Sequence, residues 1–195
     1  MSGNTVPPAG FAAALIAGGQ SRRMGQDKAW LDWQGQPLWQ FQLGKLKELN
    51  PALLLVSCRE EQRITSEGAE VLHDPADNQG PLPALARCLS RARTPLLVLA
   101  VDMPHVTVPL LCELVQQSAA PAEGAVFHGA HGYEPLCAVY PVASLPLLED
   151  SLTQGNLRLQ VFVQQAVDAG LMRVIPLSKE QEALFFNLNT SADLA

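Results

Sequence analysis

The chain has 195 residues and carries 13 lysines and arginines against 19 aspartates and glutamates, which gives a formal net charge of −6. This acidic balance argues against a nucleic-acid-binding protein, which usually presents a basic face, so no nucleic-acid partner is expected. Hydrophobic residues make up 48% of the sequence, which is typical of a globular domain and excludes a disordered chain.

The length fits one domain with a sizeable core, and we expect a single domain over residues 1–195. No apolar run reaches the roughly 20 residues that span a bilayer. The first nine residues lack the basic start of a signal peptide and are expected to form a flexible tail. Four widely spaced cysteines predict buried free thiols in a reducing compartment. These features together predict a cytoplasmic protein without membrane contact.

The first 118 residues alternate between apolar runs and segments with helical spacing. Apolar runs at residues 11–17, 52–57, 69–72 and 95–101 predict strands, and residues 60–67 predict a short helix or turn. Helices are expected to begin at Pro37, to cover residues 81–92 and to follow Thr107 as the capping residue. Strands without internal alternation are typical of a sheet buried on both faces. The pattern therefore predicts βαβ units and a parallel sheet.

The second half is less regular. Residues 125–128, 135–140, 172–175 and 183–188 are strand candidates, and Leu159, Phe162, Val163 and Ala166 form a helical stripe. We expect these strands to form a mixed edge of the same sheet. The predicted fold class is α/β, with three Rossmann-like layers around a mostly parallel, partly mixed central sheet.

A glycine-rich stretch, LIAGGQSRRMGQDK from Leu15 to Lys28, follows the first predicted strand. Glycines let main-chain N–H groups approach a ligand closely, and successive N–H groups can form an anion-binding concavity. The cations of Arg22, Arg23 and Lys28 would add positive charge, which suits a nucleoside triphosphate. The spacing is neither that of a Walker A loop nor that of GxGxxG. The alternative is a glycine turn with solvated cations.

Two aspartates end predicted strands, where ligands bind in open α/β sheets. Asp102 follows the apolar run 95–101 and is a natural Mg²⁺ ligand beside a triphosphate. Asp74 is similar, although DPADN is also a turn sequence. Each aspartate could instead be a helix cap or a turn carboxylate.

Histidines and tryptophans give weaker signals. His128 and His131, in FHGAHGYEP, could bind a metal, but a glycine-rich polar loop is the preferred interpretation. Trp30, Trp33 and Trp39 are expected to pack at the edge of the core and not to stack on a base.

The sequence LIAGGQSRRMGQDKAWLDWQGQPLWQ closely resembles the signature of the molybdenum cofactor guanylyltransferases, L-x-A-G-G-x-S-x-R-M-G-x-D-K followed by G-x-P-L. DNQGPL, VDMP, EPLCAVY and FNLNTSADL resemble later segments of the same family. The likeness spans nearly the whole chain. It implies a Rossmann-like nucleotidyltransferase that transfers GMP from GTP to the molybdopterin cofactor, forms the guanine dinucleotide cofactor and releases pyrophosphate.

The resemblance also implies roles for particular residues. Arg23, Lys28 and Asp102 would be catalytic, with Asp102 holding Mg²⁺ as the cofactor. The nucleotide would contact Leu15, Ala17, Gly18, Gly19, Ser21, Lys28, Asp74 and Asp102. The pterin would face Arg158, Asn187 and Asn189. GTP and the molybdopterin cofactor would be substrates, and molybdoenzymes or cofactor-delivery proteins are candidate partners.

The chain departs from the family pattern at two places. Ala84 stands where the family usually has glycine, and its methyl group is expected to narrow the site. The segment VSCRE around Ser57 and Cys58 lacks the asparagine that the family often places there. Alternatives that stay open are the use of another nucleotide or acceptor, as in cytidylyl transfer to molybdopterin or a sugar-phosphate reaction, and a non-catalytic relative that only binds the cofactor.

Overall fold

A computed structural model describes residues 10–19, 27–74, 80–118 and 123–188. Its centre is a seven-stranded sheet in the order β5-β4-β1-β6-β8-β7-β9. In that order the strands are Glu70–His73, Leu53–Cys58, Ala12–Ile16, Leu96–Ala100, Gly132–Tyr140, Gly124–Gly129 and Met172–Pro176. Strand β8 runs antiparallel to both neighbours, β6 and β7, whereas the other pairs are parallel. The predicted mostly parallel, partly mixed sheet is confirmed.

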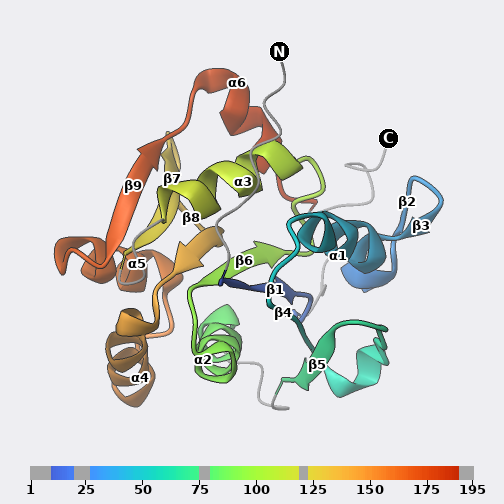
Figure 1. The fold of residues 1–195 in the computed structure, drawn as a ribbon, viewed down its shortest axis with the longest axis horizontal. Helices are drawn as coiled ribbons and strands as arrows, with labels where there is room; N and C mark the ends of the chain where they lie inside the picture. Colours follow the sequence, from blue (N-terminus) through green and yellow to red (C-terminus); the bar gives the residue numbers. More distant parts are fainter. Residues whose placement is uncertain (1–9, 20–26, 75–79, 119–122, 189–195) are drawn as a thin grey trace.

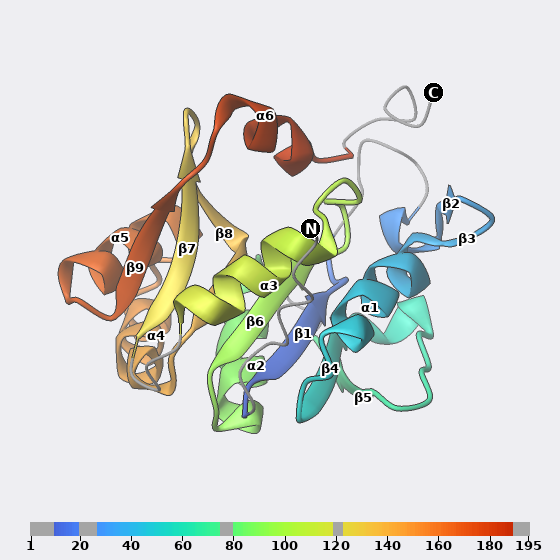
Figure 2. The same ribbon diagram turned by 45° about the horizontal axis from the view of Figure 1, so that its top comes forward.

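Helices cover both faces of the sheet and complete three layers (Figures 1 and 2). Helices α1 (Leu38–Glu48) and α3 (Val108–Gln117) lie on one face. Helices α2 (Pro81–Ala92), α4 (Leu145–Thr153) and α5 (Leu159–Asp168) lie on the other. Short elements connect these layers: α6 (Lys179–Glu182), the 3-10 turns Lys28–Trp30, Glu60–Gln62, Val142–Ser144 and Ala183–Phe185, and a hairpin of β2 (Asp32–Trp33) and β3 (Gln36–Pro37).

Strand β1 shows why the central strands lack alternation. All five of its residues are buried. Ala13 and Leu15 belong to the core under α1 and α3, whereas Ala12, Ala14 and Ile16 belong to the core under α2, α4 and α5. Because successive side chains point to opposite faces and both faces are covered, every position of the strand is apolar.

The strand predicted at residues 183–188 is wrong. Ala183–Phe185 is a 3-10 turn, and the three residues after it have no regular structure. A capping box at Ser178, with Ser178 Oγ accepting from the Gln181 N–H, starts a helical turn just upstream. The buried Phe185 ring packs against Phe127 of β7 with a centroid distance of 5.5 Å. The apolar residues therefore cover a sheet face and do not extend its edge.

Helices α4 and α6 and the β2–β3 hairpin were not predicted. The hairpin turns at Gln34 and Gly35, which both have positive φ, a conformation that glycine adopts without strain. Residues 1–9, the expected tail, lie outside the described residues. Among the described residues, no helix combines the length and apolar character needed to cross a bilayer.

Candidate active site

Four parallel strands end at the same edge of the sheet. The residues that follow β1, β4, β5 and β6 at this edge include Gly18, Asp74 and Asp102. Leu15 and Ala17 are almost fully buried at the end of β1. The N–H groups of Ala17 and Gly18 both donate to the Ser57 carbonyl of β4, at 2.8 and 3.1 Å. These two amides therefore fix the loop to the sheet.

Lys28 and Asp102 meet at this edge. Lys28 Nζ lies 3.0 Å from Asp102 Oδ2, and the two side chains are 17% and 26% exposed. The pair joins the end of the glycine-rich stretch to the end of β6 across 74 residues of sequence. The two groups that the sequence assigned to phosphate and metal are thus neighbours in one partly solvent-accessible place.

A network around Asp27 joins the described residues at the two ends of the glycine-rich stretch. Arg59 Nη2 donates to Asp27 Oδ2 at 2.6 Å, and Arg59 Nη1 donates to the Gly19 carbonyl at 2.6 Å. Gln62 Nε2 donates to the Ala17 carbonyl at 2.9 Å and to Asp27 Oδ1 at 3.1 Å. Arg59 and Gln62 therefore tie together the described residues on either side of residues 20–26. Neither residue was predicted to belong to the site. The sequence feature that could have indicated them is the polar segment that directly follows the buried strand β4.

Helix α1 holds the loop that carries Asp102. Gln42 Nε2 donates to the carbonyls of Ala100 and Met103 at 3.0 and 2.9 Å. Lys45 Nζ donates to the carbonyls of Pro104 and Val106 at 2.6 and 2.8 Å. Burial lowers the pKa of Lys45 from 10.5 to about 8. Two buried polar side chains thus satisfy carbonyls that would otherwise lack partners around Asp102.

The C-terminal segment reaches the same place. The Leu188 N–H donates to the Asp102 carbonyl at 2.9 Å. The neighbouring Asn187 Oδ1 is buried and lacks a hydrogen-bond partner among the described residues. A buried carbonyl oxygen without a donor is an available ligand for a hard cation. Among the described residues no group of three or more His, Cys, Asp or Glu could hold a metal.

Asp74 forms a second cluster on the β4–β5 side. Its Oδ1 accepts a hydrogen bond from Ser57 Oγ at 2.5 Å and pairs with Arg87 Nη2 of α2. Its Oδ2 faces Gly18, where an added Cβ would lie only 1.9 Å away. Glycine at position 18 is therefore required by the close approach of the Asp74 carboxylate. The family resemblance assigns Asp74 to the nucleotide, whereas Arg87 was not predicted.

Glu134 is a further titratable group on this side of the sheet. Leu99 of β6 pairs with Cys137 of β8, so the antiparallel register carries Glu134 toward the edge at which Asp102 lies. Burial raises the pKa of Glu134 from 4.5 to about 7. This carboxyl group changes charge near neutral pH.

Other predicted site residues lie elsewhere or outside the described chain. Arg158 is exposed at the residue before α5, and it makes no hydrogen bond or ion pair with the described residues of the carboxyl edge. Ser21, Arg23 and Asn189 lie outside the described residues. The expected narrowing of the site by Ala84 is not supported, because Ala84 is 4% exposed and belongs to the core under α2.

The tryptophans lie at the edge of the core and the cysteines are free thiols, as predicted. His128, which was expected in a glycine-rich loop, lies in strand β7. Trp30 packs edge-on against Trp39, with a centroid distance of 6.0 Å. Trp33 contacts His105, and His128 packs against Tyr133 in the β7–β8 hairpin. All four cysteines are free thiols, of which three are buried and Cys112 is half-buried.

Comparison with known proteins gives consistent matches over most of the chain. A family model described as a MobA-like NTP transferase domain matches residues 13–169. A probable molybdenum cofactor guanylyltransferase from Opitutus terrae is 35% identical over 94% of this chain and 92% of its own length. A molybdenum cofactor guanylyltransferase from Pseudomonas fluorescens is 35% identical over 80% of each chain. The crystal structure of molybdopterin-guanine dinucleotide biosynthesis protein A from Archaeoglobus fulgidus superposes with a TM-score of 0.72 at 25% identity, covering 94% of both chains.

Proposed function

The chain belongs to the MobA-like NTP transferases, the family of the molybdenum cofactor guanylyltransferases that it matches, and from this membership we propose that it transfers GMP from GTP to the molybdopterin cofactor. The products are the guanine dinucleotide form of the cofactor and pyrophosphate. The observation that carries the proposal is the meeting of Lys28 and Asp102, 3.0 Å apart, at the carboxyl edge of the sheet. This edge is where α/β proteins bind nucleotides.

In the proposed reaction, a phosphate oxygen of the pterin attacks the α-phosphorus of GTP. A new P–O bond forms, and the bond between the α-phosphorus and the oxygen that bridges it to the β-phosphate breaks. The attacking oxygen is already anionic, so the chain does not need a strong general base. Its contribution is to position the two substrates and to stabilise charge. Lys28 places a cation at the phosphates, and Arg23 is proposed to add a second one.

We place Mg²⁺ at Asp102, and the unpartnered Asn187 Oδ1 fits a second ligand from the protein. Bound there, the ion would neutralise charge on phosphate oxygens. The family resemblance assigns Asn187 to the pterin, and we propose the metal as a second partner of its Oδ1. The wall of the proposed nucleotide site consists of Leu15, Ala17, Gly18 and Gly19. Ser21 is proposed to contact the nucleotide, and Arg158 and Asn189 are proposed to contact the pterin.

The proposed substrates are therefore GTP and the molybdopterin cofactor, and the proposed location is the cytoplasm. Molybdoenzymes or cofactor-delivery proteins are the proposed recipients of the product.

Pyrophosphate release with GTP, Mg²⁺ and molybdopterin cofactor tests the proposal. We expect activity with GTP that exceeds activity with CTP or with a sugar phosphate as the acceptor. Lys28→Ala and Asp102→Ala should each fold and lose about 10²–10³ in kcat, because each removes a preorganised charge from the reacting phosphates. Near-full activity of either variant contradicts its assigned role. Binding of GTP without any transfer would favour the non-catalytic alternative.

A further inference from the structure

The two oxygens of the Asp74 carboxylate have different surroundings. Oδ1 accepts from Ser57 Oγ and pairs with Arg87 Nη2, and the same Nη2 lies 3.3 Å from Ser57 Oγ. Among the described residues, no donor reaches Oδ2. Arg87 and Ser57 thus occupy one oxygen of a carboxylate that is only 17% exposed and leave the other as an acceptor.

The free oxygen points at the glycine-rich stretch. A Cβ on Gly18 would lie 1.9 Å from Oδ2 and 3.1 Å from the carboxylate carbon. Oδ2 is therefore held against the part of the β1 loop that the proposed function assigns to the nucleotide. Because Oδ1 is bound by two donors, the carboxylate cannot rotate without losing both hydrogen bonds.

We propose that Arg87 is a positioning residue for nucleoside recognition, and this proposal rests on the proposed function. Its guanidinium holds Asp74 so that Oδ2 accepts a hydrogen bond from an N–H or O–H of the bound nucleoside. Arg87 acts through Asp74 and not on the reacting phosphates. The family pattern often has an asparagine in the segment that reads VSCRE in this chain. Here the Arg87 guanidinium and the hydroxyl of Ser57, which belongs to that segment, are the polar groups that hold Asp74.

The cost of this arrangement supports a functional role for Arg87. Arg87 Nε is buried and has no hydrogen-bond partner among the described residues. An unsatisfied buried donor is unfavourable. Proteins break such local rules most often at functional sites.

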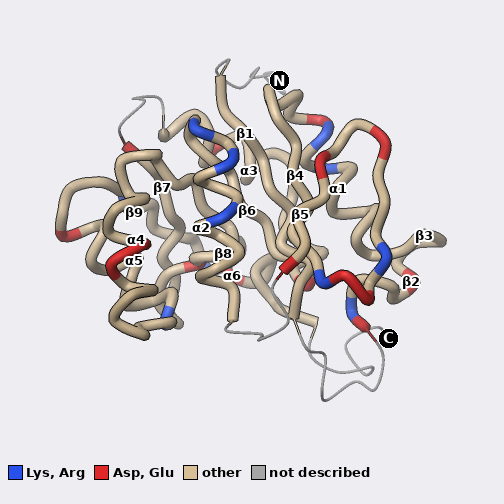
Figure 3. Tube along the Cα trace, turned by 90° about the horizontal axis from the view of Figure 1, so that it is seen from below, with Lys and Arg blue, Asp and Glu red and all other residues tan. Residues whose placement is uncertain are grey.

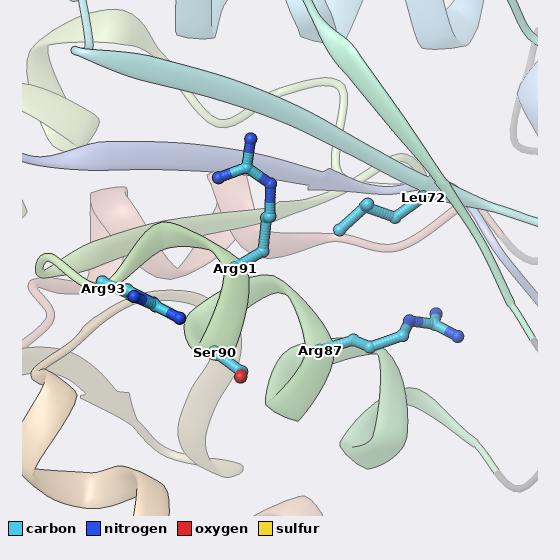
Figure 4. Close-up of a pocket in the computed structure, with 5 residues that line it drawn as sticks. All are labelled: Leu72, Arg87, Ser90, Arg91 and Arg93. Carbon is cyan, nitrogen blue, oxygen red and sulfur yellow. The ribbon is translucent and has the colours of Figure 1, made fainter.

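Helix α2 offers an internal control. Arg91, one turn beyond Arg87, donates to Glu70 Oε1 and Oε2 at 2.8 and 2.6 Å and is 51% exposed. Basic residues recur along α2 (Figure 3). Around the hollow lined by Leu72, Arg87, Ser90, Arg91 and Arg93, Arg87 extends in a different direction from Arg91 (Figure 4). Both Arg87 and Arg91 pair with a carboxylate at or just after β5, but only the Arg87 partner faces Gly18.

We assign the donor to the exocyclic amino group of guanine or to the ribose 2′-hydroxyl, and nucleotide analogues separate these two groups. Inosine triphosphate lacks the guanine amino group, and 2′-deoxyguanosine triphosphate lacks the ribose 2′-hydroxyl. A site that pairs a buried polar group with a substrate N–H or O–H discriminates strongly against an analogue without that donor. Wild-type protein is therefore expected to bind one of the two analogues more weakly than GTP.

The experiment measures binding of GTP and both analogues by calorimetry with Mg²⁺, without acceptor, to wild type, Arg87→Met and Arg91→Met. Arg87→Met should weaken GTP binding by about 10- to 100-fold, because a charge-assisted hydrogen bond is lost. It should bind the discriminated analogue almost as wild type does, so that discrimination disappears. Arg91→Met should bind all three nucleotides as wild type does.

Thermal unfolding checks that each variant is folded. Arg87→Lys keeps the charge without the planar fork and should restore part of the discrimination. It also replaces Arg87→Met if that variant does not fold. The proposal is overturned if wild type binds all three nucleotides equally well. It is also overturned if Arg87→Met, or Arg87→Lys in its place, discriminates as fully as wild type does, or if binding of all three nucleotides weakens equally. The binding experiment contains no acceptor, so its outcome does not depend on the transfer reaction. If Arg87→Met loses discrimination but the wild-type protein does not transfer GMP, the proposed reaction is rejected and the role of Arg87 stands.

Discussion

Glu134 shows how one residue makes stability depend on pH. Its pKa is raised from 4.5 to about 7 by burial, so between these values the folded state holds a proton that the unfolded state has released. The free energy of unfolding therefore falls as pH rises from about 4.5 to 7. Glu134→Gln cannot ionise, so this fall is absent. We expect the variant to gain about 1–2 kcal/mol over wild type at pH 8 and little at pH 5, after allowing for partial solvent screening.

Urea unfolding of wild type and Glu134→Gln at several pH values checks this expectation. Glu149→Gln is the control, because Glu149 is exposed on α4. A stability difference between wild type and Glu134→Gln that stays constant from pH 5 to 8 would show that the Glu134 carboxyl is not shifted by burial.

At the scale of elements, α1 is a support for Asp102 as well as a cover for the sheet. Gln42 reaches from this helix to the carbonyls of Ala100 and Met103 on either side of the Asp102 turn. Gln42→Leu removes both hydrogen bonds from buried carbonyls. We expect a loss of about 1–2 kcal/mol in the free energy of unfolding and a fall of about tenfold in kcat/KM, because Asp102 is no longer held in place.

Gln40→Leu is the matched control, since Gln40 is exposed on the same helix. Its stability and its kcat/KM should stay close to the wild-type values. If Gln42→Leu is destabilised but transfers GMP as fast as Gln40→Leu, α1 contributes to stability alone.

The sequence predicted the elements whose pattern is local. Residues 11–17 and 95–101 read as buried strands because both faces of β1 and β6 are covered. Residues 183–188 are also apolar, but Phe185 packs onto Phe127, a contact across the fold that no local pattern reveals. Helix α4 was missed although Ser144 and Pro146 are typical of a helix start. The helix has only nine residues, and it follows directly on a 3-10 turn at Val142–Ser144.

For the candidate site, the sequence predicted the groups that end strands or follow glycines. Lys28 and Asp102 were expected at one crevice, and they lie in contact. The supporting residues could not be predicted in the same way. Arg59, Gln62 and Arg87 act through partners that are distant in sequence, such as Gly19, Ala17 and Asp74. An arginine on an amphipathic helix looks like an ordinary solvated residue until the fold places a carboxylate beside it.

At the scale of the whole molecule, the continuous sheet leads us to expect one cooperative folding unit. Phe162 of α5 is fully buried against the second half of the sheet, whereas the three tryptophans all lie between residues 30 and 39. Phe162→Ala should lower the free energy of unfolding by about 3–5 kcal/mol. In a single domain, the tryptophan fluorescence transition must move together with the circular dichroism transition.

Val161→Ala is the control for this experiment, because Val161 is 36% exposed on the same helix. It should shift the transition by much less. If the tryptophan transition of Phe162→Ala stays at the wild-type position while its circular dichroism transition moves to milder conditions, the chain unfolds as two units and not as one.

The hydrogen bond from Leu188 to Asp102 sets an order of assembly during synthesis. A chain leaves the ribosome N-terminus first, and folding proceeds as segments emerge. The glycine-rich stretch, α1 and the Asp102 turn are all made long before Leu188, which joins them through its main-chain N–H. A nascent chain can therefore build most of the crevice early, but Leu188 reaches the Asp102 turn only after all the other described helices and strands have been made.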